Sequence, residues 1–155
     1  MKITKDYPNL TRDKNGNYVL NGDLISDENI EIDLDGALIV TGDISARACI
    51  KAKYGIKAGG SITAGCNITV GWDINAEHDI TAGWDIKAGW GIKAGHDIEA
   101  GDEIEAGTYI DCGKRICAGL SSYEDDDDFN KIIRCAELRH GTIVYGDLII
   151  TKKEG

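Results

Sequence analysis

The hydrophobic positions along the chain repeat every six residues. Isoleucine occupies thirteen consecutive sixth positions, from Ile44 to Ile116. Alanine follows two positions later except at Val70 and Cys112, and glycine usually follows one position after that, as in GWDIKA, GWGIKA and GHDIEA. A period of six does not fit an α-helix with 3.6 residues per turn. The repeat therefore predicts short strands separated by regular turns.

Within each hexad the isoleucine and the alanine lie two residues apart, so both side chains point to the same side of a strand. The residue between them, usually Lys, Thr or Glu, points outward. We expect glycine to turn the corner because it tolerates a positive φ. Three sides close a triangular coil of about 18 residues, and the coils stack at roughly 4.8 Å. The predicted fold is all-β, a single-stranded parallel β-helix, or β-solenoid.

The repeat also predicts the organisation of the chain. Residues 1–21 are expected to form an N-terminal cap and residues 22–119 the hexapeptide β-helix. Residues 120–131 are expected to form an acidic loop insertion and residues 132–155 a C-terminal capping coil, because open strand edges need protection. In that last coil a six-residue spacing resumes at Ile132, Leu138, Val144 and Ile150.

Length and cysteine content narrow the class of protein. The 155 residues suit one domain, and no apolar run near 18 residues predicts a transmembrane helix. The start, MKITKDYPNL, lacks the apolar stretch of a signal peptide, so we expect a cytoplasmic protein with no membrane contact. The five cysteines show no paired C-x-x-C spacing and are expected to be free thiols, with no metal and no cofactor.

Charge is distributed unevenly along a chain of net charge −10. Residues 41–95 carry six basic and five acidic side chains, a net of +1, whereas residues 96–130 carry two basic and eleven acidic ones, a net of −9. An acidic surface repels the nucleic-acid backbone, so direct nucleic-acid binding is not expected. It could instead meet a basic protein partner.

Residues 18 apart should stack on one face of the solenoid, which places several candidate binding residues. Tyr54, Trp72 and Trp90 form one predicted ladder, and Trp84 belongs to another. Exposed aromatic side chains in line can bind a partner or a sugar ring, or can simply stabilise the sheet through contacts with one another. The tentative partner-binding residues are Tyr54, Trp72, Trp84, Trp90, Glu124, Asp125, Asp126, Asp127 and Asp128.

Two further clusters suggest metal sites but lack the expected pattern. His78 and His96 should lie one coil apart, yet a metal site needs three or four convergent ligands, so two solvated histidines are the simpler interpretation. The run from Glu124 to Asp128 lacks the alternating ligands and glycine turn of a calcium loop and indicates a solvated segment.

The recurring GDI-x-A pattern, as in GDISA (42–46), resembles the bactofilins, bacterial polymer-forming proteins with a triangular right-handed β-helix. The resemblance covers most of residues 22–119 and implies a right-handed coil and self-association. The left-handed hexapeptide acyltransferases place the small residue two positions before the large aliphatic one. Here alanine follows two positions after isoleucine, which favours the right-handed winding.

The motifs predict no enzyme, because the chain shows no Ser-His-Asp pattern, no phosphate loop and no H-E-x-x-H. We expect a non-catalytic structural or protein-interaction solenoid that binds a protein partner or itself as a homo-oligomer. The alternative is an acidic inhibitor of the phage-encoded type, which mimics nucleic acid and binds a basic protein groove. That alternative requires one continuous acidic face, whereas the hexad spacing places Glu99, Glu105 and Asp111 on three different sides.

Overall fold

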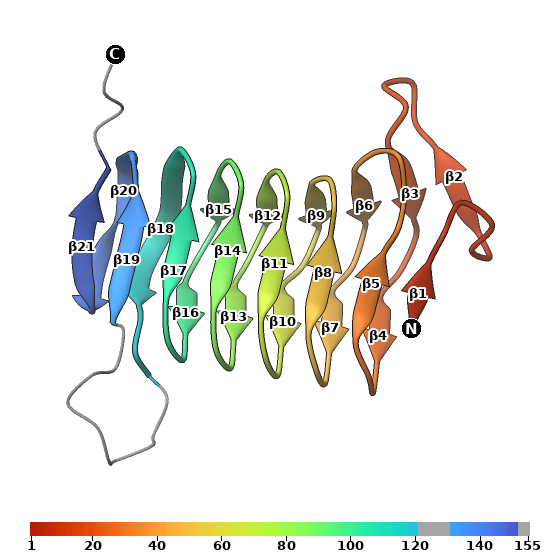
Figure 1. Ribbon diagram of the computed structural model, residues 1–155. Helices are drawn as coiled ribbons and strands as arrows, with labels where there is room; N and C mark the ends of the chain where they lie inside the picture. Colours follow the sequence, from red (N-terminus) through yellow and green to blue (C-terminus); the bar gives the residue numbers. More distant parts are fainter. Residues whose placement is uncertain (121–130, 152–155) are drawn as a thin grey trace.

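A computed structural model describes residues 1–120 and 131–151 and shows an all-strand parallel β-solenoid of about seven turns (Figure 1). The described strands pair in parallel, except that β2 (Leu10–Arg12) is antiparallel to β3 (Tyr18–Leu20). The predicted fold class is confirmed. Each coil contributes one short strand to each of three faces, which we name A, B and C in the following lists.

Face A consists of β1 (Lys2–Ile3), β5 (Ile30–Ile32), β8 (Ile50–Ala52), β11 (Ile68–Val70), β14 (Ile86–Ala88), β17 (Ile104–Ala106), β19 (Ile132–Cys135) and β21 (Asp147–Ile150). Face B contains β3, β6 (Leu38–Val40), β9 (Ile56–Ala58), β12 (Ile74–Ala76) and β15 (Ile92–Ala94). Face C contains β4 (Leu24–Ser26), β7 (Ile44–Ala46), β10 (Ile62–Ala64), β13 (Ile80–Ala82) and β16 (Ile98–Ala100). Two longer strands run from face B round to face C, β18 (Tyr109–Cys117) and β20 (Glu137–Tyr145).

The strand register explains the sequence period. Ile50 pairs with Ile68 and Ile62 pairs with Ile80, so equivalent residues are 18 positions apart. The first coil is longer, since Leu24 pairs with Ile44. Because identical positions stack, every isoleucine of the repeat points into the same lumen.

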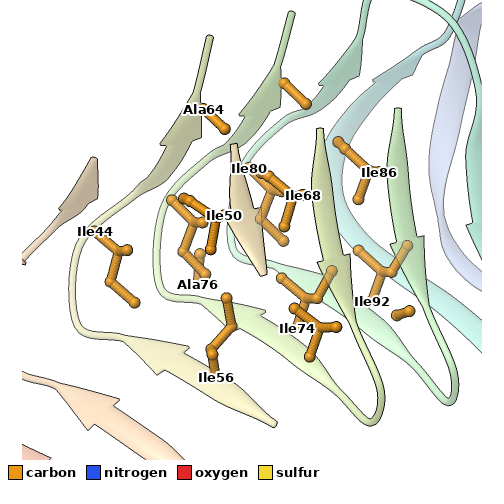
Figure 2. Packing of buried hydrophobic residues seen from close by; sticks show 14 of the residues in the cluster. Ile44, Ile50, Ile56, Ala64, Ile68, Ile74, Ala76, Ile80, Ile86 and Ile92 are labelled. Atoms are coloured by element: carbon orange, nitrogen blue, oxygen red, sulfur yellow. The ribbon is translucent and has the colours of Figure 1, made fainter. Parts of the chain in front are cut away.

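The lumen is filled by the isoleucines and alanines that the repeat predicted (Figure 2). The isoleucines at the sixth positions are 0–1% exposed, and the alanines two residues later are also buried. No polar or charged residue among the described ones is buried. Burying a side chain of this size stabilises the fold by about 1.5–3 kcal/mol, so the isoleucine stack dominates the stability of the solenoid.

The corner glycines serve a different purpose from the expected one. Among described glycines, a positive φ occurs at Gly16, Gly22, Gly119, Gly141 and Gly146, and none of these lies at a corner inside the regular coils. At the repeated corners there is no space for a side chain, because a Cβ on Gly83 would lie 2.0 Å from the carbonyl oxygen of Gly65. The backbones of successive coils approach so closely there that a side chain would collide with the coil before it.

The last coil follows a register different from the predicted one. Ile133, and not Ile132, pairs with Ile104 and is fully buried. Val144 and Ile150, at which the six-residue spacing resumes, are also shifted from the isoleucine positions, because Ile143 pairs with Ile116 and Ile150 pairs with Cys135. A bulged β20 separates them from the regular spacing, because its register with β18 shifts at several points.

Candidate functional surfaces

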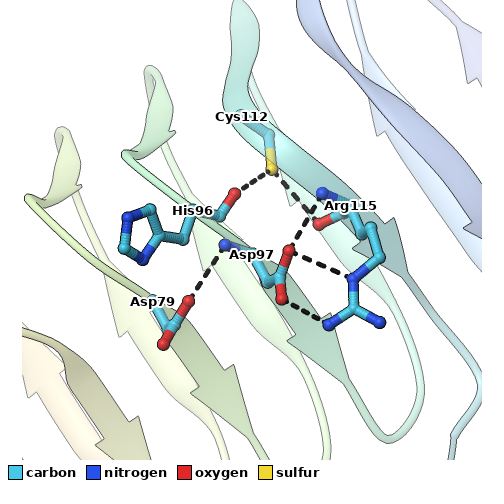
Figure 3. A network of polar contacts seen from close by, with 5 residues as sticks. All are labelled: Asp79, His96, Asp97, Cys112 and Arg115. Carbon is cyan, nitrogen blue, oxygen red and sulfur yellow. Dashed lines mark hydrogen bonds and ion pairs between the residues drawn. The ribbon is translucent and has the colours of Figure 1, made fainter.

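The corner between faces B and C carries a ladder of side chains that accept backbone hydrogen bonds. Asp43 accepts the N–H of Ser61 at 2.7 Å, and Ser61 accepts that of Asp79 at 3.3 Å. Figure 3 shows the next two steps, in which Asp79 accepts the N–H of Asp97 and Asp97 accepts that of Arg115, both at 3.0 Å. A buried backbone N–H without an acceptor is costly, so these carboxylates stabilise the corner.

The same geometry occurs at the other two corners. Asp85 accepts the N–H of Glu103 at 3.1 Å, and Asp73 accepts that of Gly91 at 2.9 Å. The aspartate before each isoleucine in the GDI and WDI motifs is therefore a structural residue. We conclude that these aspartates are not free ligands for a partner, although their abundance makes the chain acidic.

The corner between faces A and B carries an aromatic ridge, formed by Tyr54, Trp72 and Trp90. The ring centroids of Tyr54 and Trp72 are 5.6 Å apart and tilted by 57°, and those of Trp72 and Trp90 are 6.1 Å apart and nearly parallel at 22°. Both tryptophans remain more than half exposed. The predicted ladder is therefore present, with its rings in contact along the solenoid axis.

The neighbouring rings and an open hollow define the surroundings of Trp72 in the ridge. Trp72 lies between the tilted ring of Tyr54 and the stacked ring of Trp90. An open hollow of about 260 Å³ beside it is lined by Lys57, Asp73 and Asn75, among others. Exposed rings in line of this kind can stack on a sugar ring or contact a protein.

Trp84 does not join the ridge. It lies at the corner between faces C and A, where its backbone N–H donates to the carbonyl oxygen of Cys66. Its side chain is as exposed as those of Trp72 and Trp90. The structure thus brings together three of the four aromatic candidates and places the fourth on a separate edge.

The acidic residues that the structure describes lie on all three faces. Glu99 pairs in register with Thr81 on face C, Glu105 with Lys87 on face A, and Asp111 with Lys93 on face B. This scatter is what the hexad spacing predicted. The other acidic candidates, Glu124, Asp125, Asp126, Asp127 and Asp128, lie outside the described residues.

Several of these carboxylates are paired with cations. Asp97 accepts hydrogen bonds from the Arg115 guanidinium, with a closest N–O distance of 2.6 Å, and this contact lowers the pKa of the Asp97 carboxyl. Glu103 lies 3.8 Å from Lys87, and Glu105 lies 3.4 Å from Arg134. Local pairing reduces the negative potential that a basic partner would meet.

Metal-ligand and nucleophile candidates are sparse in the described part of the chain. The rings of His78 and His96 are 5.1 Å apart, but residues 1–120 and 131–151 contain no group of three or more His, Cys, Asp or Glu able to hold a metal ion. Burial raises the pKa of the Cys112, Cys117 and Cys135 thiols, which opposes formation of the reactive thiolate. The described residues also include no helix long and apolar enough to span a membrane.

The C-terminal end of the solenoid is an apolar surface that the sequence did not reveal. The side chains of Val144, Tyr145, Leu148, Ile149 and Ile150 are 39–58% exposed on the last coil. β20 and β21 are the last strands of their sheets, and among described residues no further strand pairs with their outer edges. Figure 1 shows these two strands at the blue, C-terminal end of the molecule.

Comparison of the chain with protein-family models, with curated proteins and with solved structures found no match. The structure itself places the chain among β-helix repeat proteins with coils of about 18 residues. Its function must therefore be argued from the surfaces described above.

Proposed function

We propose that this chain is a non-catalytic interaction solenoid, similar in its coils to the bactofilins, that associates with itself through its C-terminal end. The observation that carries the proposal is the exposed apolar last coil, with Leu148, Ile149 and Ile150 on a strand that has no outer partner among the described residues. An apolar edge strand of this kind is a template for pairing with another chain.

The N-terminal end has the opposite character. β2 folds back antiparallel on β3, and Tyr7 and Leu10 pack against the hydrophobic core. β1 and β4 are edge strands too, so the two ends differ in their exposed apolar area and not in unpaired edges alone. A molecule that exposes most of this apolar area at one end forms a closed pair rather than a filament, because the same surface of two copies meets across a two-fold axis. In that arrangement the outer edges of β20 and β21 would pair antiparallel with those of the second copy.

The aromatic ridge offers a second contact surface along the side of the solenoid. Tryptophan and tyrosine are enriched among the residues that contribute most to protein–protein affinity. Trp72 and Trp90 are held in line by their stacking, so little conformational entropy is lost when they bind. This geometry supports a protein partner on the corner between faces A and B.

The acidic-inhibitor alternative has less support. Its requirement for one continuous acidic face is not met by Glu99, Glu105 and Asp111, which lie on three faces. Paired carboxylates such as Glu105 with Arg134 weaken it further.

Light scattering over a concentration series, at low and high salt, tests the proposal. We expect a mass of two chains that does not fall at high salt, since apolar contacts are not screened. Leu148→Lys should weaken association at least tenfold, because a charge would enter the apolar contact. Ile25→Lys is the matched control, since Ile25 is 61% exposed on face C near the other end and its replacement should leave the mass unchanged.

Either of two outcomes would overturn self-association through this end. One is a mass of a single chain across the whole series. The other is equal loss of association in Leu148→Lys and Ile25→Lys, which would place the contact elsewhere.

A further inference from the structure

Two thiols lie side by side at the corner between faces C and A. Cys49 directly precedes β8, and Cys66 lies two residues before β11. The pairing of Ile50 with Ile68 places Cys66 one coil beyond Ala48, and the N–H of Cys66 donates to the carbonyl oxygen of Ala48 at 3.2 Å. Cys66 is therefore the diagonal neighbour of Cys49 on the adjacent coil.

This diagonal has the dimensions of a disulfide. Adjacent coils are separated by about 4.8 Å and successive residues by about 3.3 Å along the strand, so the two Cα atoms are expected about 6 Å apart. Disulfides span Cα–Cα distances of about 4.4–6.8 Å. The two thiols lie close enough that Cys49 raises the pKa of the Cys66 thiol.

These two cysteines also differ from the other three in accessibility. Cys49 and Cys66 are partly exposed, whereas Cys112, Cys117 and Cys135 are buried. A small-molecule oxidant can reach the first pair without any opening of the coil. Accessible cysteines next to a second thiol are the type that oxidises reversibly.

We propose that Cys49 and Cys66 form a redox-sensitive dithiol that is oxidised to an intrachain disulfide by a small-molecule disulfide of the glutathione class. One protein thiolate attacks a sulfur of the small disulfide, which breaks its S–S bond and releases one small thiol. The second protein thiolate then attacks the protein sulfur of the mixed disulfide and releases the second small thiol. Two protein S–H groups become one S–S bond, and their two protons and two electrons end on the two small thiols.

Either of the two thiols can make the first attack. Whichever thiol attacks first, the other lies on the adjacent coil and can resolve the mixed disulfide. The new bond would join two successive coils across a loop of one turn, next to Trp84 on the following coil.

The full chain is equilibrated in a series of reduced and oxidised glutathione buffers and analysed by peptide mass mapping under non-reducing conditions. We expect two thiols to be lost together, one cross-linked peptide pair containing Cys49 and Cys66, and full reversal by dithiothreitol. The disulfide should raise Tm by roughly 5–10 °C, since it restricts the unfolded chain. Fluorescence of Trp84 should fall on oxidation, because a nearby disulfide quenches indole emission, and Trp84→Phe should abolish that change.

Cys49→Ser and Cys66→Ser should each prevent the cross-link and leave a single glutathione adduct, whereas Cys117→Ser should oxidise like the natural chain. The proposal is overturned if Cys49 and Cys66 each carry glutathione without joining. It is equally overturned if the cross-link forms between two chains or involves another cysteine. None of these readouts depends on association through the C-terminal end, which Leu148→Lys removes separately.

Discussion

The two ends of the solenoid carry the same three-residue motif in different surroundings. GDL occurs at residues 22–24 and again at 146–148, and both glycines have a positive φ, +96° and +116°. Both leucines occupy lumen positions, since Leu24 pairs with Ile44 and Leu148 with Ile133. Yet Leu24 is 1% exposed and Leu148 is 39% exposed.

The difference shows that burial in a solenoid is set by the neighbouring coil and not by the local motif. Leu24 pairs with Ile44 of the next coil and shares one hydrophobic core with the buried Ile3, Tyr18 and Leu20. No described coil follows Leu148. Each coil of a repeat protein contacts only its neighbours, so a terminal coil without a cap must expose its lumen residues.

Removing the N-terminal cap should produce the largest change, because it would make the two ends alike. Deletion of residues 1–12 takes away β1, β2 and the packing of Tyr7 and Leu10. With both ends open, we expect long and polydisperse species in place of a closed pair. Light scattering measures the mass, and circular dichroism checks that the β-structure is retained. A folded deletion variant that stays at two chains would show that the cap does not limit assembly.

Truncating the two leucines of the GDL motifs sharpens the comparison. Leu24→Ala should reduce the free energy of unfolding by about 2–5 kcal/mol, because it leaves a cavity in a closed core. Leu148→Ala should cost only about 1 kcal/mol, because its side chain is partly exposed already. Urea unfolding at low protein concentration measures both. Equal losses would mean that Leu148 is covered in solution.

The sequence was sufficient to predict the regular coils, because one period defines both the strands and their register. Thirteen isoleucines in phase leave a single way to fill the lumen, and the 18-residue spacing correctly placed Tyr54, Trp72 and Trp90 in one ladder. The register predicted for the last coil was wrong for a physical reason. Ile132 and Ile133 are equally apolar, and a shift of one residue moves every side chain to the opposite face.

The sequence analysis missed the proximity of Cys49 and Cys66 because these residues occupy different positions of the hexad. Cys49 is one residue and Cys66 two residues before an isoleucine, so a comparison of residues exactly 18 apart does not pair them. The aspartate ladder was missed because it follows from backbone N–H groups at the corners, which a side-chain pattern does not show. A hydrogen-bond inventory of one triangular coil would have indicated that an acceptor is needed before each isoleucine.

The smallest expected effect is a pH dependence confined to the capped end. At the N-terminal cap, the Tyr18 hydroxyl donates to Asp35 at 2.6 Å and the Arg12 guanidinium at 3.0 Å. These contacts, with the Tyr18 hydrogen bond foremost, lower the pKa of the Asp35 carboxyl. A lowered pKa stabilises the folded chain at pH values above the unfolded value near 3.8, and this contribution is lost as the pH falls through the lower folded value.

We therefore expect the urea midpoint of the natural chain to exceed that of Asp35→Asn slightly at pH 7, with the difference disappearing on acidification below about pH 4. Asp97, whose pKa is also lowered, is present in both chains, so its contribution cancels in the difference. A gap that stays constant from pH 7 to pH 3 would assign the effect of the substitution to packing and not to charge. If the gap closes instead, the N-terminal end of the solenoid is held partly by an ionised carboxylate, whereas the C-terminal end exposes apolar side chains.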